Sequence, residues 1–224
     1  MKMISDSCRW ILVLVFLSVV ALGQAAPAAE EWQSWSRISL EGPLCDLWRI
    51  SLDEEFRSQV GGGGLFFHRS DAGVNYRAAS WVRLGAYYWH DYHRKGDAWM
   101  EERRLHGHTT LRWTLWTLPM RHRSRFEWRF PDGASSHWRY RDMIRIGLPP
   151  GWLPFGMSGY FGNELFIDLR DGSYHQNRMD IGFTARVKGR FHIDFYFMLR
   201  SDRVSSDSSW RHTPLFGQKL KFVF

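Results

Sequence analysis

The chain has 224 residues, enough for one domain and too few for two of ordinary size. It carries a formal net charge of +7 and is 17% aromatic, with 13 tryptophans, yet its mean hydropathy is −0.39. The apolar residues are therefore dispersed among charges and not pooled in long apolar helices. Cys8 lies in a segment expected to be removed, which leaves Cys45 unpaired and excludes a small disulfide-stapled fold.

The N-terminus has the form of a secretory signal peptide. Lys2 and Arg9 supply positive charge, Trp10 to Leu22 is apolar, and the small residues that follow provide A-x-A-like cleavage sites. The apolar run is shorter than the roughly 20 residues that a membrane-spanning helix needs. We therefore expect residues 1–25 to be a cleaved signal peptide and the mature chain to be exported.

Beyond this segment the regular pattern has period two, which places alternate side chains on opposite faces of a strand. Between Met120 and Phe130 one face is mostly apolar, and the other is almost entirely charged. Similar alternation recurs along the rest of the chain. Candidate strands begin near Trp32, Trp48, Leu65, Trp81, Met100, Met120, Trp138, Pro154, Gln176, Phe191 and Leu215.

Alternation alone also fits a soluble barrel with its apolar face inside. Strands of about 10–13 residues, tryptophans at strand ends, and connections that alternate in length favour a membrane barrel. Residues 78–80, 149–151 and 188–190 are predicted to be short periplasmic turns, and residues 91–98, 131–137 and 202–212 to be outer loops. The predicted fold is an all-β, transmembrane antiparallel β-barrel of the outer-membrane type.

The strand number is less regular, because single-chain bacterial barrels have even numbers of strands. Counting back from the C-terminus through the alternating connections gives about ten crossings that start near Trp48, with twelve as the alternative. Residues 48–224 then form the barrel. Residues 26–47 form an N-terminal segment in which Trp32 to Leu40, whose alternation is poor, is either tethered to the barrel or a first strand.

The last five residues, LKFVF, place Leu220, Phe222 and Phe224 on one face, with Phe224 at the very end. This resembles the terminal-strand signal by which the outer-membrane insertion machinery recognises its clients. The expected partners are this machinery and outer-membrane lipid, and no nucleic acid.

Five segments occur in a fixed order. They are HRSRFEWRF (122–130), YRDMIRIGLP (140–149), NELFIDL (163–169), QNRMDIGFTARV (176–187) and IDFYFMLRSD (193–202). Together they resemble the outer-membrane barrel family known as domain of unknown function 2490, over nearly the whole mature chain. The resemblance implies a signal peptide, a barrel in the outer membrane of a Gram-negative bacterium, and no established activity.

A ladder of charges lies on the face that is expected to point into the barrel. Its members are Arg123, Arg125, Glu127, Arg129, Arg139, Arg141, Arg145, Glu164, Asp168, Arg178, Asp180 and Arg186. Opposite charges on neighbouring strands should pair, because an unpartnered buried charge costs several kcal/mol. The ladder is interpreted either as a salt-bridged brace or as an arginine-lined path for anionic solutes, whose carboxylate or phosphate groups suit the arginine fork.

Two enzyme patterns are weighed against this reading. His122, Ser124 and Asp142 lie on the expected lipid-facing side and resemble the site of outer membrane phospholipase A, with a nucleophile, a base and an orienting group. The inferred hairpin centre, however, places Asp142 nearer Phe126 than Ser124. The pair Asp91 and His93, expected in an outer loop, resembles the Asp-His pair of omptin proteases.

The histidines show no metal-ligand spacing, and neither a metal nor a cofactor is expected. The predicted function is that of an outer-membrane β-barrel that is structural or forms a narrow, arginine-lined channel for anionic solutes. A lipid hydrolase is the alternative.

Overall fold

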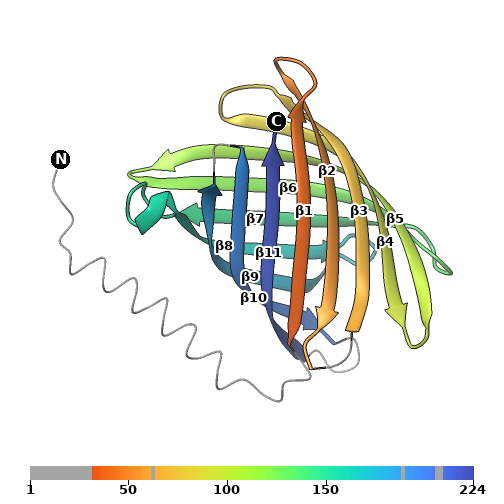
Figure 1. Ribbon diagram of the computed structural model, residues 1–224. Coiled ribbons are helices and arrows are strands. Elements are labelled where there is room, and N and C mark those ends of the chain that lie inside the picture. The colour runs from red at the N-terminus through yellow and green to blue at the C-terminus, as the bar shows by residue number, and fades with distance from the viewer. Residues whose placement is uncertain (1–31, 62–63, 188–189, 205–208) are drawn as a thin grey trace.

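A computed structural model of the protein describes residues 32–61, 64–187, 190–204 and 209–224, and within these ranges the chain forms a closed barrel of eleven strands (Figure 1). The strands are β1 (Gln33–Pro43), β2 (Trp48–Gln59), β3 (Gly64–Arg77), β4 (Val82–Lys95), β5 (Ala98–Leu115), β6 (Leu118–Pro131), β7 (His137–Gly147), β8 (Ser158–Asp168), β9 (Ser173–Val187), β10 (Phe191–Arg203) and β11 (Trp210–Val223). The expected signal peptide, residues 1–25, lies outside the described residues.

The order of the strands around the barrel follows the sequence. Each strand pairs in antiparallel fashion with the next, and β1 pairs in parallel with β11 to close the barrel. Directions alternate along the chain, so the first and last strands of an odd-numbered barrel must run the same way. In Figure 1 the front strands β1, β2 and β11 run across the back strands β5 to β7, as the tilt of barrel strands requires.

The predicted all-β barrel is confirmed, and its eleven strands lie between the ten favoured and the twelve allowed by the sequence. Of the two interpretations of Trp32 to Leu40, the tethered segment was wrong, because these residues contribute most of β1. Its alternation is poor because Trp35 points inward, where it is 3% exposed, while the neighbouring Ser36 lies on the outer face.

The barrel is inverted relative to a soluble one. Phe126 is 51% exposed and the adjacent Glu127 is 0% exposed. The same alternation runs through the other strands, so apolar side chains cover the outside and most of the buried side chains are polar or charged. No helix among the described residues has the length and apolar character to cross a membrane.

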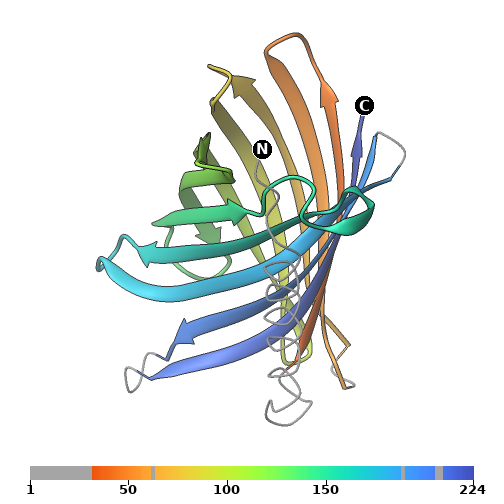
Figure 2. The same ribbon diagram turned by 90° about the vertical axis from the view of Figure 1, so that its left-hand side faces the viewer.

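Two of the connections that the structure describes in full differ from those expected, while the predicted connections at 188–190 and 202–212 lie partly outside the described residues. β4 continues to Lys95, so the predicted outer loop at 91–98 shrinks to Gly96 and Asp97, with Gly96 at a φ of 63°. The β7–β8 connection, predicted to be a tight turn at 149–151, instead extends from residue 148 to 157 and contains the short helix η3 (Pro154–Gly156), as Figure 2 shows. Prolines at 149, 150 and 154 lack the N–H that a ladder needs, so β8 begins only at Ser158.

Candidate functional site

The half of the lumen away from the C-terminus is filled by arginines stacked on buried aromatic rings. The Arg57 guanidinium lies 3.6 Å from the ring centroid of Trp35, and that of Arg69 lies 3.9 Å from the centroid of Trp89. Such contacts contribute about 2 kcal/mol when desolvated. We call this layer the plug; its aromatic members are Trp35, Phe67, Trp89 and Phe166.

Buried carboxylates complete the plug. Glu127 accepts hydrogen bonds from Arg139 at 2.5 Å and from Arg141 at 2.7 Å. The other carboxylates follow the same rule: Asp91 pairs with Arg69 and Arg104, Glu164 with Arg123 and Arg141, and Glu55 with Arg37 and Arg57. Because each carboxylate meets two guanidiniums, charge-assisted hydrogen bonds offset the cost of removing it from water.

The remaining members of the predicted ladder differ in their contacts: some form ion pairs, one contacts aromatic rings, and two lie outside the lumen network. Arg129 pairs with Glu102, Arg145 pairs with Asp180, and Arg125 lies 3.5 Å from Glu127. Arg178 lies between the rings of Trp35 and Phe166. Two members stand apart from the lumen network, at the strand ends: Asp168 and Arg186. Asp168 holds Arg170 in the β8–β9 turn, where this hydrogen bond raises the pKa of Arg170, and Arg186 is exposed near the end of β9.

The sequence analysis missed the half of the plug that β1 to β5 supply. Its charged members are Arg37, Glu55, Arg57, Arg69, Asp91, Glu102 and Arg104. The signal was present as alternation of Tyr87, Trp89 and Asp91 with Tyr88, His90 and Tyr92. Aromatic residues on both faces of β4 concealed it, and Asp91 was assigned to a loop.

A cavity of about 490 Å³ occupies the half of the lumen nearer the C-terminus. Its lining reaches Glu41, Arg112 and Lys221, close to the ends of β1, β5 and β11, where a second cavity continues to the β1–β2 turn. The cavity therefore opens at the C-terminal end of the barrel, and the plug fills the other half of the lumen.

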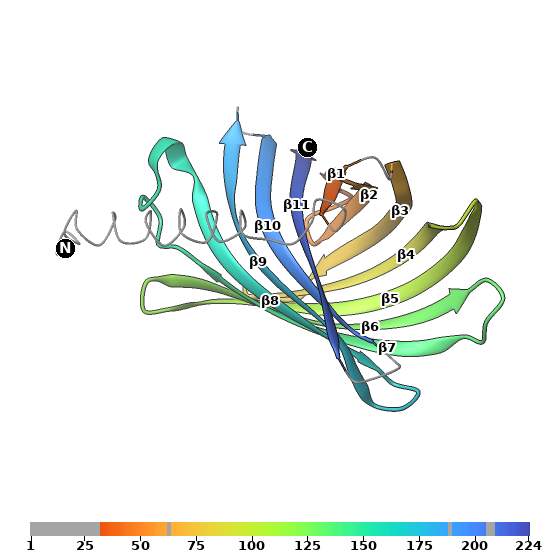
Figure 3. The ribbon, with the colours of Figure 1, turned by 90° about the horizontal axis from the view of Figure 1, so that it is seen from below.

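One wall of the cavity is strongly basic. It is formed by β5, β6 and β7, which lie side by side in the curved sheet of Figure 3, and its cations are Arg112, Arg121, Arg123, Arg125, Arg141 and Arg145. The strand register places Arg121 opposite both Arg112 and Arg145. Like charges directly opposite one another destabilise a sheet. Among the described residues, no carboxylate lies within ion-pair distance of Arg121, whose Nη2 is 3.8 Å from the Met143 sulfur.

Two histidines of β5 belong to the same wall. The rings of His106 and His108 stack on Tyr87 with centroid distances of 5.0 and 5.4 Å. Within the described part of the chain, both ring nitrogens of His106, Nδ1 of His108 and Nε of Arg125 are buried without a hydrogen-bond partner. The four nitrogen atoms belong to three residues that all line the cavity.

An acidic corner lies on β2 and β3, which are separated from the basic wall by β4. Asp53 accepts hydrogen bonds from Ser39 and Ser51 and lies 3.4 Å from Lys219. Asp71 is only 9% exposed, and its Oδ1 has no hydrogen-bond partner among the residues that the structure describes. The cavity thus combines a basic wall with one unpaired carboxylate.

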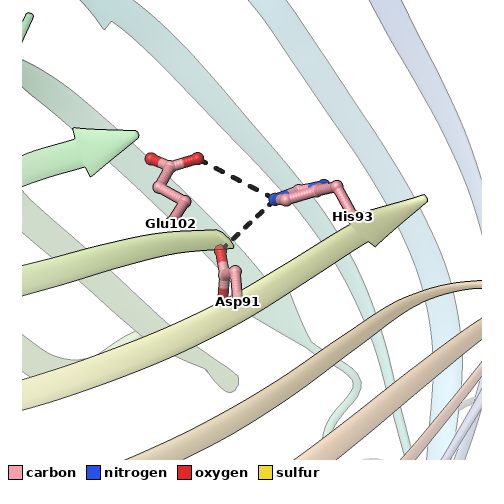
Figure 4. A group of neighbouring side chains, drawn as sticks. All are labelled: Asp91, His93 and Glu102. Atoms are coloured by element: carbon pink, nitrogen blue, oxygen red, sulfur yellow. Dashed lines mark ion pairs between the residues drawn. The ribbon is translucent and has the colours of Figure 1, made fainter. Parts of the chain in front are cut away.

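Asp91, His93 and Glu102 are close enough to form a potential metal site, with ligand atoms within 4.8 Å of one another. In Figure 4, His93 Nε2 lies between the two carboxylates, 3.8 Å from each. The carboxylates are also engaged by three guanidiniums, those of Arg69, Arg104 and Arg129. Three positive charges against two negative ones oppose a cation, so the arrangement favours an ion-pair network. The expected loop position of Asp91 and His93 was wrong, because both lie in β4.

His122, Ser124 and Asp142 meet on the outer face. The expectation that Asp142 lies nearer Phe126 was wrong, because β6 and β7 pair with Ser124 directly opposite Asp142. Asp142 Oδ2 lies 2.8 Å from His122 Nε2 and accepts hydrogen bonds from Ser124 at 3.0 Å and Tyr140 at 2.7 Å.

These hydrogen bonds do not form a nucleophilic triad. A triad needs the serine hydroxyl to bond to the histidine that removes its proton. Here the Ser124 hydroxyl bonds to Asp142 and Tyr140, and His122 Nε2 faces the same carboxylate oxygen. The geometry therefore favours a self-satisfied polar cluster over a hydrolase site.

The predicted insertion signal lies on the outer face of β11. Phe222 is 40% exposed and packs against Phe191 with a centroid distance of 4.7 Å. Leu220 is half-buried, and Phe224 is 64% exposed, with its N–H donating to the Glu41 carbonyl at 2.9 Å.

Fold and lumen together define a closed β-barrel with an apolar exterior and a charged interior. Residues 32–211 match the family described as "Protein of unknown function (DUF2490)", and the chain belongs to this family, which confirms the resemblance found in the sequence.

Among solved structures, an anion-selective porin from Comamonas acidovorans is similar, with a TM-score of 0.41 and 8% identity. The match covers 80% of this chain and 55% of the porin, so the chain spans about half the porin's length. No curated protein matches the chain.

Proposed function

We propose that the protein is an integral outer-membrane β-barrel whose basic cavity takes up small anionic solutes. The observation that carries this proposal is the row of Arg112, Arg121 and Arg145 on adjacent strands. Three cations in register need counter-charges, and of the three Arg145 alone has a carboxylate partner among the described residues. A solute with carboxylate or phosphate oxygens supplies the missing charge and matches the arginine fork.

The membrane location is supported by the outer surface. Strands of 11 to 18 residues meet or exceed the 9–11 or so that a tilted strand needs to cross a bilayer. The apolar exterior would be unstable in water and is stable in lipid. Export through a cleaved signal at residues 1–25, and insertion guided by Leu220, Phe222 and Phe224, complete this part of the proposal.

The plug limits how solutes pass. Its paired charges close one half of the lumen, so solutes enter from the C-terminal end and traverse the barrel only when the plug rearranges. The brace and the anion path are then two halves of one lumen. We expect a low resting conductance with a preference for anions.

The test combines binding and conductance. Purified protein should bind inorganic phosphate in calorimetry, and bilayer currents in a salt gradient should reverse on the anion-selective side. Arg121→Gln should weaken phosphate binding about tenfold or more, because a hydrogen bond to a charged group is lost. Arg103→Gln is the matched control, since Arg103 is an exposed arginine on the outer face of β5. Absence of both phosphate binding and anion selectivity would refute the proposal.

A further inference from the structure

We propose that the preferred solute of this cavity is a zwitterion, with a carboxylate bound by the basic wall and an ammonium group bound by Asp71. The inference rests on the proposed function and specifies the solute class. A cavity of about 490 Å³ is within the range of small-molecule sites, which is about 300–1,000 Å³.

The negative end of the solute is assigned by the unpartnered donors. Arg121 has no carboxylate at ion-pair distance among the described residues, and Arg125 has only Glu127, at 3.5 Å, with its Nε unbonded. His106 is 5% exposed and can donate a hydrogen bond from its ring. A buried donor without a partner costs about 1–3 kcal/mol, so several together indicate an oxygen-rich anion.

The positive end is assigned by Asp71. The neighbouring Asp53 is balanced by Lys219 and by two serine hydroxyls, whereas no cation lies within ion-pair distance of Asp71 in the described part of the chain. A buried, unpaired carboxylate is strongly unfavourable. A hydroxyl group would satisfy its hydrogen bond but not its charge, so an ammonium group is the better complement.

The strand order separates the two ends. Asp71 lies on β3, His106 on β5 and Arg125 on β6, with the Tyr87 ring of β4 between them. Gly73 lies opposite Tyr87, where a Cβ would come within 2.2 Å of the ring, so this glycine allows Tyr87 to lie flat along the wall. Asp71 and the basic wall line the same cavity, so a solute in it can bridge them.

The experiment compares three probes of equal chain length on the mature protein in detergent micelles. These are 4-aminobutyrate, which carries both charges, butyrate, which carries the negative charge alone, and butylamine, which carries the positive charge alone. We expect 4-aminobutyrate to bind about tenfold more tightly than butyrate, and butylamine to bind more weakly than either. Asp71→Asn should abolish the preference and leave butyrate binding equal or stronger.

Each outcome separates the two proposals. If butyrate and phosphate bind and 4-aminobutyrate is no better, the zwitterion is wrong and anion uptake stands. If none of the anions binds, both fail. The zwitterion is also wrong if butylamine binds as tightly as 4-aminobutyrate. It is wrong as well if the Asp71→Asn protein still prefers 4-aminobutyrate to butyrate. Arg121→Gln should weaken 4-aminobutyrate and butyrate alike, and the unmodified protein alone decides the matter should a variant not fold.

Discussion

Glu127 and Asp91 are the most enclosed charges of the plug, and Glu127 shows what such a charge does. It is 0% exposed and accepts hydrogen bonds from Arg139 and Arg141. A single carboxylate therefore holds guanidiniums from β7 against β6, and its loss would leave two buried cations without their shared partner. In this barrel the interior charges replace the apolar core of a soluble protein.

We expect Glu127→Gln to lower the free energy of unfolding by about 3–5 kcal/mol, the cost of breaking a buried ion pair on one side. Urea unfolding followed by tryptophan fluorescence measures this. Glu101→Gln is the control, because the Glu101 side chain is 42% exposed and pairs with His90 on the outer face. Equal stability of the two variants would mean that the plug does not brace the barrel.

At the scale of strands, glycines on the inner face decide where large side chains fit. Gly85 on β4 lies directly opposite His108 on β5, and a Cβ at this glycine would lie 2.4 Å from His108 Cε1. The histidine therefore lies over the glycine and lines the cavity. The same arrangement places Asp180 over Gly162 and Tyr160 over Gly182.

We expect Gly85→Ala to cost about 1–3 kcal/mol of stability through overpacking and to weaken phosphate binding by displacing His108. The comparison is Gly107→Ala on the neighbouring strand, where the nearest atom to a new Cβ is 3.8 Å away. Unfolding and phosphate titration of both proteins check this. A tolerated Gly85→Ala with unchanged binding would show that His108 does not need this space.

At the scale of the whole molecule, an odd strand number forces the parallel closure of β1 on β11. The register pairs Ile38 with Leu220. In a Cys45→Ser background, Ile38→Cys combined with Leu220→Cys should form a crosslink under mild oxidation, seen as a shift in denaturing gel mobility. Ile38→Cys with Phe216→Cys should not, because Phe216 pairs with Ser34. A crosslink in the second pair alone would disprove the register.

The location of the barrel is a further expectation at this scale. Because the exterior is apolar and Phe222 adds to it at the end of β11, mature protein should fractionate with the outer membrane and migrate faster on gels when unheated. Removing Phe224 should reduce the outer-membrane level. Recovery of folded protein from the soluble periplasm would contradict the membrane assignment, and an unchanged level without Phe224 would contradict the insertion signal.

Much of this architecture is local and could be predicted from the sequence. Period-two alternation depends only on the geometry of a strand, so it identified the faces of β6 and β7 and the charged interior with Glu127 and Arg141. Pattern analysis failed where the two faces do not separate apolar from polar residues. In β1 the inward residue is Trp35 and the outward one is Ser36, and in β4 aromatic residues lie on both faces around Asp91.

The pairing of side chains required the tertiary structure. Ser124 lies opposite Asp142, and Arg121 lies between Arg112 and Arg145, because strand ends and turn lengths fix the register of each hairpin. The strand count, the parallel closure, the position of the plug and the cavity with its unpaired Asp71 depend on how all the registers add up around the barrel. The sequence by itself determined that this chain makes an inverted barrel with a charged interior. Only the closed sheet decided which charges meet and which remain free, because partners in a barrel are set by strand register and not by separation along the chain.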